Sequence, residues 1–163
     1  MDISFKTKEG RFNYRVAGII IHDHQLLMMQ TENTPYYFLP GGRVEMNEMS
    51  EAAMVREVKE ELGIDVEINR LLWIVENFFT EELNGERFHE VGFYYLLNLK
   101  DEKLLENGCQ FTREEGEKHK LMFRWTSLEE VQKLKLYPLF LKEKILNIPQ
   151  APEHIIEIKN DLL

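Results

Sequence analysis

The segment from Asn47 to Gly63 constrains the fold of this chain more than any other. Read as a helix, it places Glu57, Glu60 and Glu61 at positions i, i+3 and i+4, on one face and within side-chain reach of each other. Four apolar residues form a stripe nearly opposite these acids: Ala52, Val55, Val58 and Leu62. The pattern predicts an amphipathic helix that packs on a core and presents its acids together.

The same segment carries start and stop signals for a helix. Asn47 and Ser50 are both residues that cap a helix N-terminus, so we expect the helix to begin at one of them. Gly63 follows Leu62 and is the expected C-terminal stop. Like charges at this spacing repel, and a hard divalent cation with oxygen ligands would relieve that repulsion. Three acids on a helix are more often plain solvated surface, so their surroundings decide between the two interpretations.

The rest of the chain predicts strands mixed with a few helices. Residues 15–31 favour a β-hairpin around a polar turn at His22–Gln25, and residues 81–86 contain the turn dipeptide Asn84–Gly85. We expect further strands at residues 36–39, 64–68, 71–79, 88–99 and 120–125, a long mobile loop with a short helical turn at 101–120, and helices from Ser127 and over 139–146. This content predicts an α/β fold in which a mixed β-sheet lies between helical layers.

Composition narrows the function classes. The chain has 163 residues, a size that suits one domain, and a formal net charge of −9, which argues against broad binding to nucleic acid. No apolar run is long enough to span a bilayer, so we expect no membrane role. The N-terminus lacks a secretory signal and Cys109 is the single cysteine, so the expected location is the cytoplasm.

The acidic helix is part of a longer pattern. From Gly42 to Ile64 the sequence reads G-x5-E-x7-R-E-U-x-E-E-x-G-U, where U is apolar, and this resembles the Nudix box at every fixed position. The flanks at 36–42 and 123–131 are also similar to that family, so the likeness extends over most of the chain. We therefore identify the chain as resembling the Nudix hydrolases.

The resemblance implies a fold, a reaction and a cofactor. The fold is a Nudix-like α/β/α sandwich with a central mixed β-sheet, as one domain over residues 1–163. The reaction is the hydrolysis of a nucleoside diphosphate linked to another group, by attack of water at phosphorus with Mg²⁺ or Mn²⁺. We expect essentially no turnover without metal.

The resemblance also assigns roles to individual residues. It implies metal ligands at Glu57, Glu60 and Glu61, with Glu57 and Glu61 the best direct ligands, and a backbone carbonyl near Gly42 as a further one. Arg56 is expected to hold a glutamate through a bidentate pair, with Glu48 as its partner or as an outer acid.

The general base is less determined by the pattern. Members of the family take it from a box glutamate or from an acid on a later loop. Our preference is Glu60, with Glu117 behind it; the other candidates are Glu90, Glu114 and Glu115.

Aromatic residues near the box are candidates for holding the base or sugar of a substrate. We assign this role to Tyr36, Phe38 and Phe78, with Tyr36 and Phe38 on the same side of a strand. Tyr37 and Phe79 are further candidates, although Phe78 and Phe79 also suit a core.

Sequence leaves the substrate open. Subgroup hints of the family lie at positions 78–81, which here read Phe-Phe-Thr-Glu and match neither the ADP-ribose nor the dinucleoside polyphosphate pattern. Nucleotide sugars, ADP-ribose, oxidised nucleoside triphosphates and dinucleoside polyphosphates all remain candidates. The alternatives in other classes are a catalytically silent nucleotide-binding sensor module and an acidic interaction protein, and the family makes a homodimer plausible.

Overall fold

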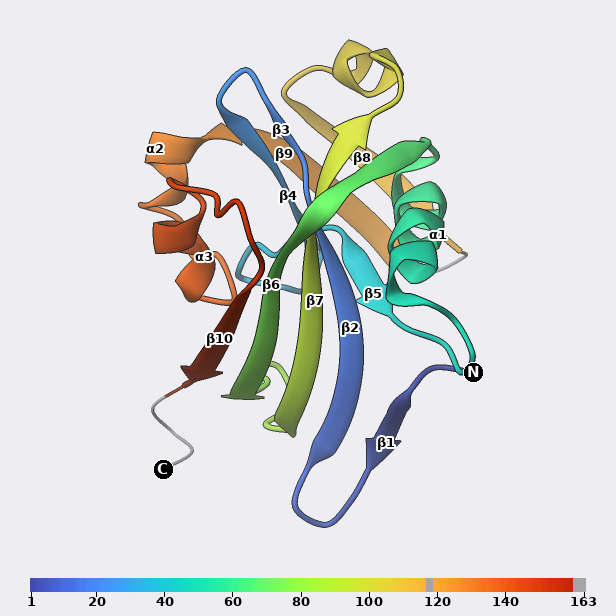
Figure 1. Ribbon diagram of the computed structural model, residues 1–163, viewed down its shortest axis with the longest axis vertical. Helices are drawn as coiled ribbons and strands as arrows, with labels where there is room; N and C mark the ends of the chain where they lie inside the picture. Colours follow the sequence, from blue (N-terminus) through green and yellow to red (C-terminus); the bar gives the residue numbers. More distant parts are fainter. Residues whose placement is uncertain (117–118, 160–163) are drawn as a thin grey trace.

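The computed structural model describes residues 1–116 and 119–159, and its strands form two sheets (Figure 1). The larger sheet has the order β1 (Ser4–Lys6), β2 (Arg11–Ile19), β7 (Arg87–Leu99), β6 (Val66–Thr80) and β10 (Glu153–Ile158), with β5 (Gly41–Arg43) also paired to β2. The smaller sheet has the order β3 (Ile21–His22), β4 (Gln25–Thr31), β9 (His119–Ser127) and β8 (Gln110–Glu115). The pairs β2–β7 and β6–β10 are parallel and the others antiparallel, so the larger sheet is mixed, as expected.

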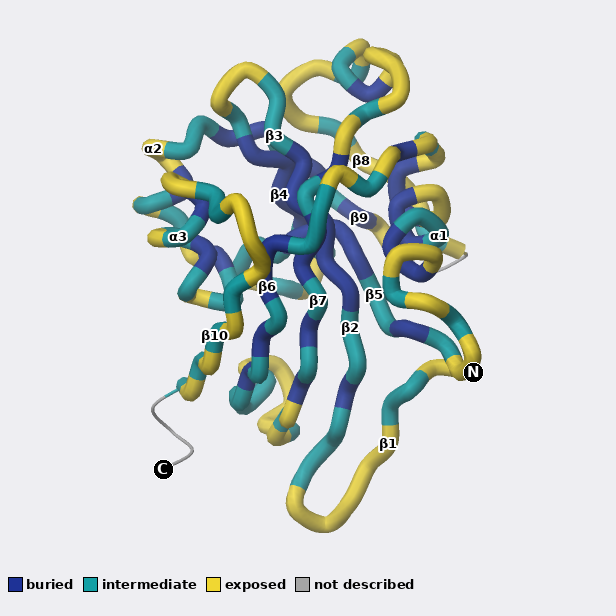
Figure 2. Tube along the Cα trace, in the orientation of Figure 1, coloured by how far each residue is buried: buried dark blue, intermediate teal, exposed yellow. Residues whose placement is uncertain are grey.

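Helices lie on both sides of the larger sheet (Figure 1). They are α1 (Ser50–Leu62), the 3₁₀ helix η1 (Lys103–Asn107), α2 (Leu128–Val131) and α3 (Phe140–Lys144). Successive strand residues point to opposite faces, and Val16 and Tyr95 accordingly pack in a core with α1 residues, whereas Ala17 and Tyr94 pack in a second core with α2 and α3 residues. The central strands are therefore buried on both faces (Figure 2), and the predicted layered α/β architecture is confirmed.

The predicted hairpins are present. β3 and β4 are joined by Asp23 and His24, both with positive φ, as a two-residue hairpin turn requires. β6 and β7 pair antiparallel on either side of the Asn84–Gly85 turn. The two strands expected at 64–68 and 71–79 are one strand, β6, because register irregularities at Ile68/Arg70 and Leu71/Trp73 let it bend without ending.

Outside the box, one predicted strand is absent, and the strands β8 and β10 were not predicted. Residues 36–39 form no strand: Phe38 and Tyr37 make only isolated bridges, to Met29 and Leu136, in a segment bounded by prolines 35 and 40. The region 101–120 contains the expected short helical turn, η1, but it also contains the strand β8. The side chains of β8 are mostly exposed and polar or charged, so nothing in the sequence indicated its pairing with β9. β10 was not expected at all, and it depends on a parallel partner, β6, that lies 80 residues earlier in the chain.

α1 ends as predicted but begins differently. Gly63 adopts a left-handed conformation with φ 70° and donates its N–H to the carbonyl of Lys59. The expected side-chain cap is absent: Met49 is the N-cap residue, and the Ser50 hydroxyl lies 2.7 Å from the hydroxyl of Tyr95. The buried apolar residues are Ala53, Met54, Val58 and Leu62, so the buried face is rotated from the predicted stripe.

The C-terminal part closes the second core. Ser127 caps α2, as expected, by accepting the N–H of Glu130 at 3.2 Å. α2 and α3 are shorter than predicted. Within the described ranges, no helix is both long and apolar enough to cross a bilayer.

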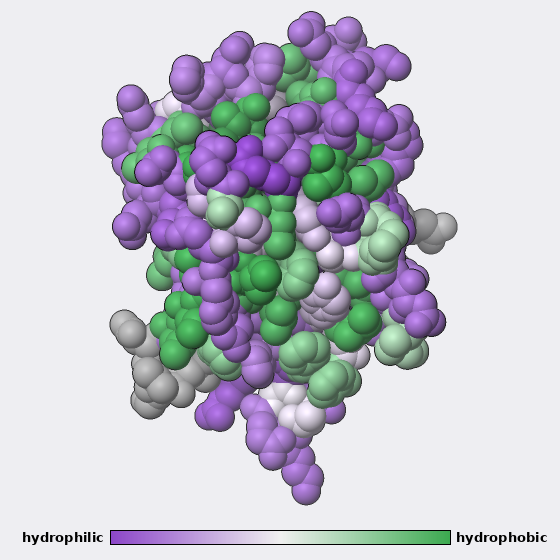
Figure 3. Space-filling model, in the orientation of Figure 1, coloured by the Kyte–Doolittle hydropathy of each residue, from purple (hydrophilic) through white to green (hydrophobic). Residues whose placement is uncertain are grey.

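Apolar side chains also reach the surface of the larger sheet. Figure 3 shows apolar patches over the strands, bordered by polar side chains. Phe5, Ile156 and Ile158 are among the exposed apolar residues, and they belong to the edge strands β1 and β10.

Leu141 tests the packing of α3. It is fully buried, whereas Leu146, just beyond the same helix, is 56% exposed. We expect Leu141→Ala to lower the free energy of unfolding by about 2–5 kcal/mol because it leaves a cavity in the second core. Leu146→Ala, the matched control, should change it by about 0.5 kcal/mol or less. Urea denaturation measures both, and equal effects would contradict this packing.

Candidate active site on α1 and β5

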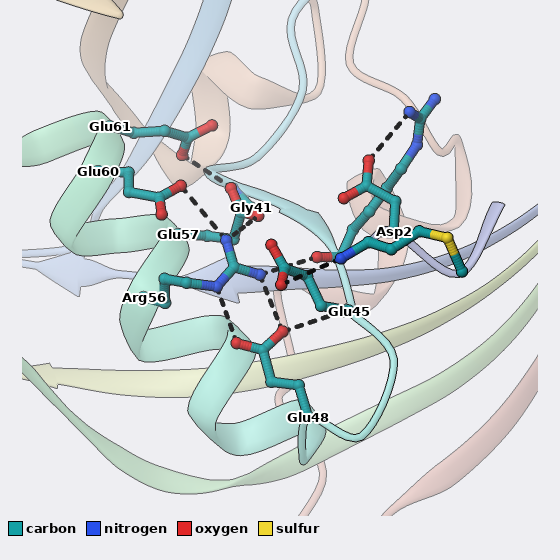
Figure 4. A network of polar contacts seen from close by, with 10 residues as sticks. Asp2, Gly41, Glu45, Glu48, Arg56, Glu57, Glu60 and Glu61 are labelled. Atoms are coloured by element: carbon teal, nitrogen blue, oxygen red, sulfur yellow. Dashed lines mark hydrogen bonds and ion pairs between the residues drawn. The ribbon is translucent and has the colours of Figure 1, made fainter.

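Arg56 occupies the centre of a polar network on α1 (Figure 4). Its Nε and Nη2 donate to the two carboxylate oxygens of Glu48 at 2.8 and 2.9 Å, which is the expected bidentate pair. Nη1 donates to Glu57 at 2.8 Å and Glu60 at 3.3 Å, and Nη2 also reaches the carbonyl of Arg43 at 3.0 Å. The guanidinium therefore joins α1 to β5 and to the loop before the helix.

Glu48 is fixed from a second direction. Its Oε2 accepts the backbone N–H of Glu45 at 3.0 Å. The hydrogen bonds from Arg56 hold the pKa of the Glu48 carboxyl below its usual range, so this acid stays ionised. Glu48 thus orients Arg56 and lies on the far side of it from the buried acids (Figure 4).

Glu57 and Glu61 are buried side by side on the inner face of α1, 9% and 6% exposed. Each has one anchored oxygen: Oε1 of Glu57 accepts from Arg56, and Oε2 of Glu61 accepts the N–H of Gly41 at 3.0 Å. The other oxygen of each carboxylate has no hydrogen-bond partner within the described residues. Both acids therefore retain a free oxygen at the end of the β5 strand.

Gly42 allows the carboxylate of Glu57 to lie directly against the backbone of β5. A Cβ at this position would lie 2.3 Å from the carboxylate of Glu57, closer than real Cβ contacts come. Glycine lets the backbone of β5 and the acid face of α1 meet directly. The glycine that opens the predicted pattern is thus required by a close approach.

Burial changes the ionisation of both acids. Removal from water raises the pKa of Glu61 to about 8, opposed by the positive charge of Arg15 and the Gly41 N–H, and reinforced by the charges of Glu57 and Glu115. Burial also raises the pKa of Glu57, opposed chiefly by Arg56. Two neighbouring carboxylates held in these conditions favour either a proton or a bound cation.

Glu60 departs from the predicted cluster. Its carboxylate faces Arg56, and its side chain is 49% exposed. Across the described part of the chain, no group of three His, Cys, Asp or Glu side chains is placed to hold a metal ion by itself. The geometry brings Glu57 and Glu61 together and leaves Glu60 at the rim.

The free oxygens of Glu57 and Glu61 suit a hard divalent cation. Mg²⁺ binds through one or two carboxylates, with waters and phosphate oxygens of a substrate completing its shell. Glu57 and Glu61 offer free carboxylate oxygens beside the glycine backbone of β5. Arg56 pairs with Glu57, but in residues 1–116 and 119–159 no cation pairs with Glu61, and the cost of burying these two neighbouring charges is what a bound ion would reduce.

A cavity of about 270 Å³ adjoins this site. Its floor comes from alternate residues of β2, β7 and β6, and its wall from the segment before β5 and the segment before α3. Tyr36 and Phe38 both line it. Phe78 does not: it lies on the opposite face of β6, 4.4 Å from the ring of His89, by a second hollow. Its neighbour Phe79 lines the cavity instead.

Arg15 connects the cavity to the acids. It lines the cavity, donates to the carbonyl of Leu39 at 3.2 Å, and its charge lowers the pKa of both Glu57 and Glu61. No role for Arg15 was predicted, although a charged residue within the apolar strand pattern 14–21 is a usable signal. Asn77, a polar residue inside the apolar run 71–79, was missed in the same way.

The structure describes some of the candidate general bases that lie beyond the box. Glu117 lies outside the described residues. Glu115, at the end of β8, lies near enough to Glu61 for its charge to raise the pKa of that acid. Glu90 is buried in the cavity floor, where it accepts from Asn13 at 2.7 Å.

Curated relatives match part of the chain. An ADP-ribose pyrophosphatase from Methanocaldococcus jannaschii is 33% identical over 87 residues, 52% of this chain and 49% of that protein. An 8-oxo-dGTP diphosphatase from Proteus vulgaris is 30% identical over 97 residues, 56% of this chain and 82% of that protein. The chain spans about half the length of the first of these relatives.

Solved structures share the fold. A NUDIX hydrolase from Nitrosomonas europaea superposes with a TM-score of 0.62 at 18% identity, over 94% of this chain and 81% of that one. A MutT protein from Bacillus halodurans gives a TM-score of 0.61 at 19% identity, over 91% and 92%. These likenesses concern the fold alone.

The family itself is decided by a sequence model. The model of the NUDIX domain matches residues 12–145, which include every residue described in the site above and most of the cavity wall. Members of this family generally use divalent metal ions and act on small nucleotide substrates. The match covers well over half of the chain, and so the chain belongs to the NUDIX domain family.

Proposed function

We propose that the protein is a metal-dependent pyrophosphohydrolase that cleaves a nucleoside diphosphate linked to another group. The observation that carries this proposal is the pair of buried carboxylates, Glu57 and Glu61, each with one oxygen anchored and one free beside Gly42. Of the four oxygens, only Oε1 of Glu57 contacts a cation of the described residues, Arg56. A hydrolase needs the free oxygens for a metal ion.

The proposed reaction assigns metal binding to the acids of α1 and phosphate binding to Arg15. Glu57 and Glu61 hold the ion with a carbonyl of the Gly41–Gly42 backbone, and Arg56 keeps Glu57 in place. A bound Mg²⁺ or Mn²⁺ supplies charge neutralisation of the diphosphate and acidifies the attacking water. Arg15 lies between the acids and the cavity, where its guanidinium can hold the phosphate oxygens in line for displacement.

The proton acceptor is an acid at the rim. We keep Glu60 as the proposed general base, because its half-exposed carboxylate can accept a proton from water, and Arg56 holds only one of its oxygens. Glu115 is the second proposal, from its closeness to Glu61. Glu117 remains a sequence-based candidate.

The relatives suggest a substrate range. One carries the name ADP-ribose pyrophosphatase and another 8-oxo-dGTP diphosphatase. We propose that the substrate of this chain lies among ADP-ribose, nucleotide sugars, oxidised nucleoside triphosphates and dinucleoside polyphosphates. The sensor alternative has no supporting observation, and metal-dependent product release from this panel separates the two. Nucleotide binding without product would favour the sensor.

Three further expectations stay predictions. They are the homodimer, the lack of broad nucleic-acid binding and the cytoplasmic location. Light scattering, binding to mixed oligonucleotides and imaging of a tagged protein would test them in turn.

Glu61→Gln tests the metal role. Gln keeps the size of the side chain but offers no charge to a cation, so we expect kcat/KM to fall by about 100-fold or more. Glu67→Gln, on the exposed part of β6, is the control and should keep full activity. Near-normal hydrolysis by the Glu61 variant, with an intact circular dichroism spectrum, would rule out this role.

The raised pKa of Glu61 predicts a pH-dependent stability of the metal-free protein. The folded-state pKa of about 8 exceeds the unfolded value of 4.5, so the neutral carboxyl stabilises the fold fully below pH 4.5 and this contribution is lost as pH rises towards 8. We expect the free energy of unfolding to fall across this window by a few kcal/mol, on the order set by such shifts. Glu57 acts in the same direction.

Two comparisons check this expectation by urea denaturation. Glu61→Gln should flatten the decline, since Gln does not titrate. Mg²⁺ should stabilise the wild type more at pH 8 than at pH 5, because it competes with the proton for the same oxygens. A wild type and a Glu61 variant with parallel profiles would contradict the burial described for this acid.

Arg56→Lys tests the positioning of Glu57. Lysine keeps the charge but cannot span Glu48, Glu57 and the Arg43 carbonyl at once. We expect the affinity for Mn²⁺, measured by calorimetry, to weaken by about 10-fold or more, as for residues that orient metal ligands. Lys59→Arg, on the exposed side of α1, should leave it unchanged. Unchanged affinity in the Arg56 variant would remove its positioning role.

A further inference from the structure

Buried polar side chains form a row across three strands of the larger sheet, and two of them, Glu90 and Asn77, line the cavity. Asn13 of β2, Glu90 of β7 and Asn77 of β6 are direct cross-strand partners, and they are 4%, 7% and 7% exposed. On the same sheet face, the next positions towards the core are Arg15, Gly92 and Val75, followed by the buried residues Ala17, Tyr94 and Trp73. Polar residues in the middle of a sheet need a reason, because burial without full hydrogen bonding costs free energy.

We propose that Glu90 is the residue that reads the nucleobase of the substrate, and that it selects a base with two adjacent N–H donors, as guanine has. This inference rests on the proposed function in one respect only, namely that the cavity holds the nucleoside part of a nucleotide. It assigns a specificity to the cavity and no step in hydrolysis.

The orientation of Glu90 is set by a chain of hydrogen bonds. Arg43 donates from Nε to Oδ1 of Asn13 at 2.8 Å, so the Asn13 amide must present its nitrogen on the other side. That nitrogen donates to Oε2 of Glu90 at 2.7 Å. Since arginine can only donate, the amide orientation is unambiguous, and the Glu90 carboxylate is held as an acceptor facing the cavity.

Glu90 keeps acceptor capacity for a ligand. Asn13 takes one lone pair of Oε2, and no described residue donates to Oε1 or forms an ion pair with Glu90. The other cavity carboxylates are more exposed and already engaged. Glu82 pairs with Lys135 and Lys159, Glu157 accepts two backbone N–H groups, and Glu81 accepts from Tyr36.

The walls suit a flat ring above this floor. Tyr36 and Tyr137 meet edge to face at 5.2 Å, and Phe38 and Phe79 also line the cavity. Hydrogen bonds to Glu81 at 2.8 Å and Glu82 at 3.0 Å fix the two tyrosine rings by their hydroxyls. Aromatic walls bind any base by stacking, so the selection between bases falls to the polar floor.

A carboxylate fixed in this position should bind the nucleobases with different affinities. Guanine presents N1–H and the exocyclic amino group side by side, which two carboxylate oxygens accept together. Hypoxanthine has the same ring but lacks the amino group, and adenine places an acceptor beside its amino group. Uracil flanks its single N–H with two carbonyl oxygens, which the carboxylate repels. Arg15 also lines the cavity and acts electrostatically on the acids of α1, so it can direct the phosphates towards them.

The test is equilibrium binding of GMP, IMP, AMP and UMP to the metal-free protein by calorimetry. GMP and IMP differ only in the amino group, so their ratio isolates the hydrogen bond at issue. We expect wild type to bind GMP about 10-fold or more tighter than IMP, as for hydrogen bonds to a charged group, and tighter still than UMP. Glu90→Gln should reduce the GMP preference to near unity, and Glu67→Gln should keep it.

Equal affinities of wild type for GMP and IMP would overturn the proposal, as would a preference that survives in Glu90→Gln or a failure of all four nucleotides to bind. The wild-type ratio needs no variant, so the test stands if Glu90→Gln does not fold. Monophosphate binding requires no turnover. A protein that prefers GMP but hydrolyses nothing would refute the hydrolase alone, and one that hydrolyses substrates without base preference would refute the base selection alone.

Discussion

The guanidinium of Arg56 is the interaction on which the rest of the site depends. It is shared between Glu48, Glu57 and the carbonyl of Arg43, and thereby fixes α1 against β5. A planar group with several donors can satisfy these acceptors at once, which a lysine could not. Because Glu57 is held on one oxygen only, the same network that secures the helix leaves the acid competent to bind a ligand.

The position of α1 has an electrostatic consequence. Glu57 and Glu61 are carried into the protein by the same helix face as Ala53 and Val58, and burial raises their pKa values. The fold therefore tolerates two acids where it would otherwise place apolar side chains. A second departure of this kind occurs across the sheet, where Asn13, Glu90 and Asn77 are buried polar residues and the last two line the cavity. Arg15 is common to both: it lines the cavity, and its charge acts on the buried acids of α1.

Sequence reasoning reached the parts of the site that depend on local spacing. The helix over 50–62 and its stop at Gly63 were foreseeable, because helical periodicity and capping are local. The Arg56–Glu48 pair was foreseeable only from the resemblance to the family, since Glu48 lies before the helix. The sequence could not tell which of Phe78 and Phe79 faces the cavity, because the face on which each side chain lies is set by the pairing register with β7. It also could not weigh Glu90, whose role depends on strand partners from distant segments.

By itself, the sequence determined the family, through the likeness of Gly42 to Ile64 to the Nudix box, and the layered α/β class, through its mixture of predicted strands and helices. Helical spacing placed Glu57, Glu60 and Glu61 on one face, and the resemblance implied that they bind metal. Only the tertiary structure decided that Glu61 and Glu57 are buried while Glu60 faces solvent and Arg56, and that 153–158 forms a strand on β6. The physical reason is that burial and parallel pairing arise from contacts between segments far apart in the chain, and such contacts leave no period in the sequence.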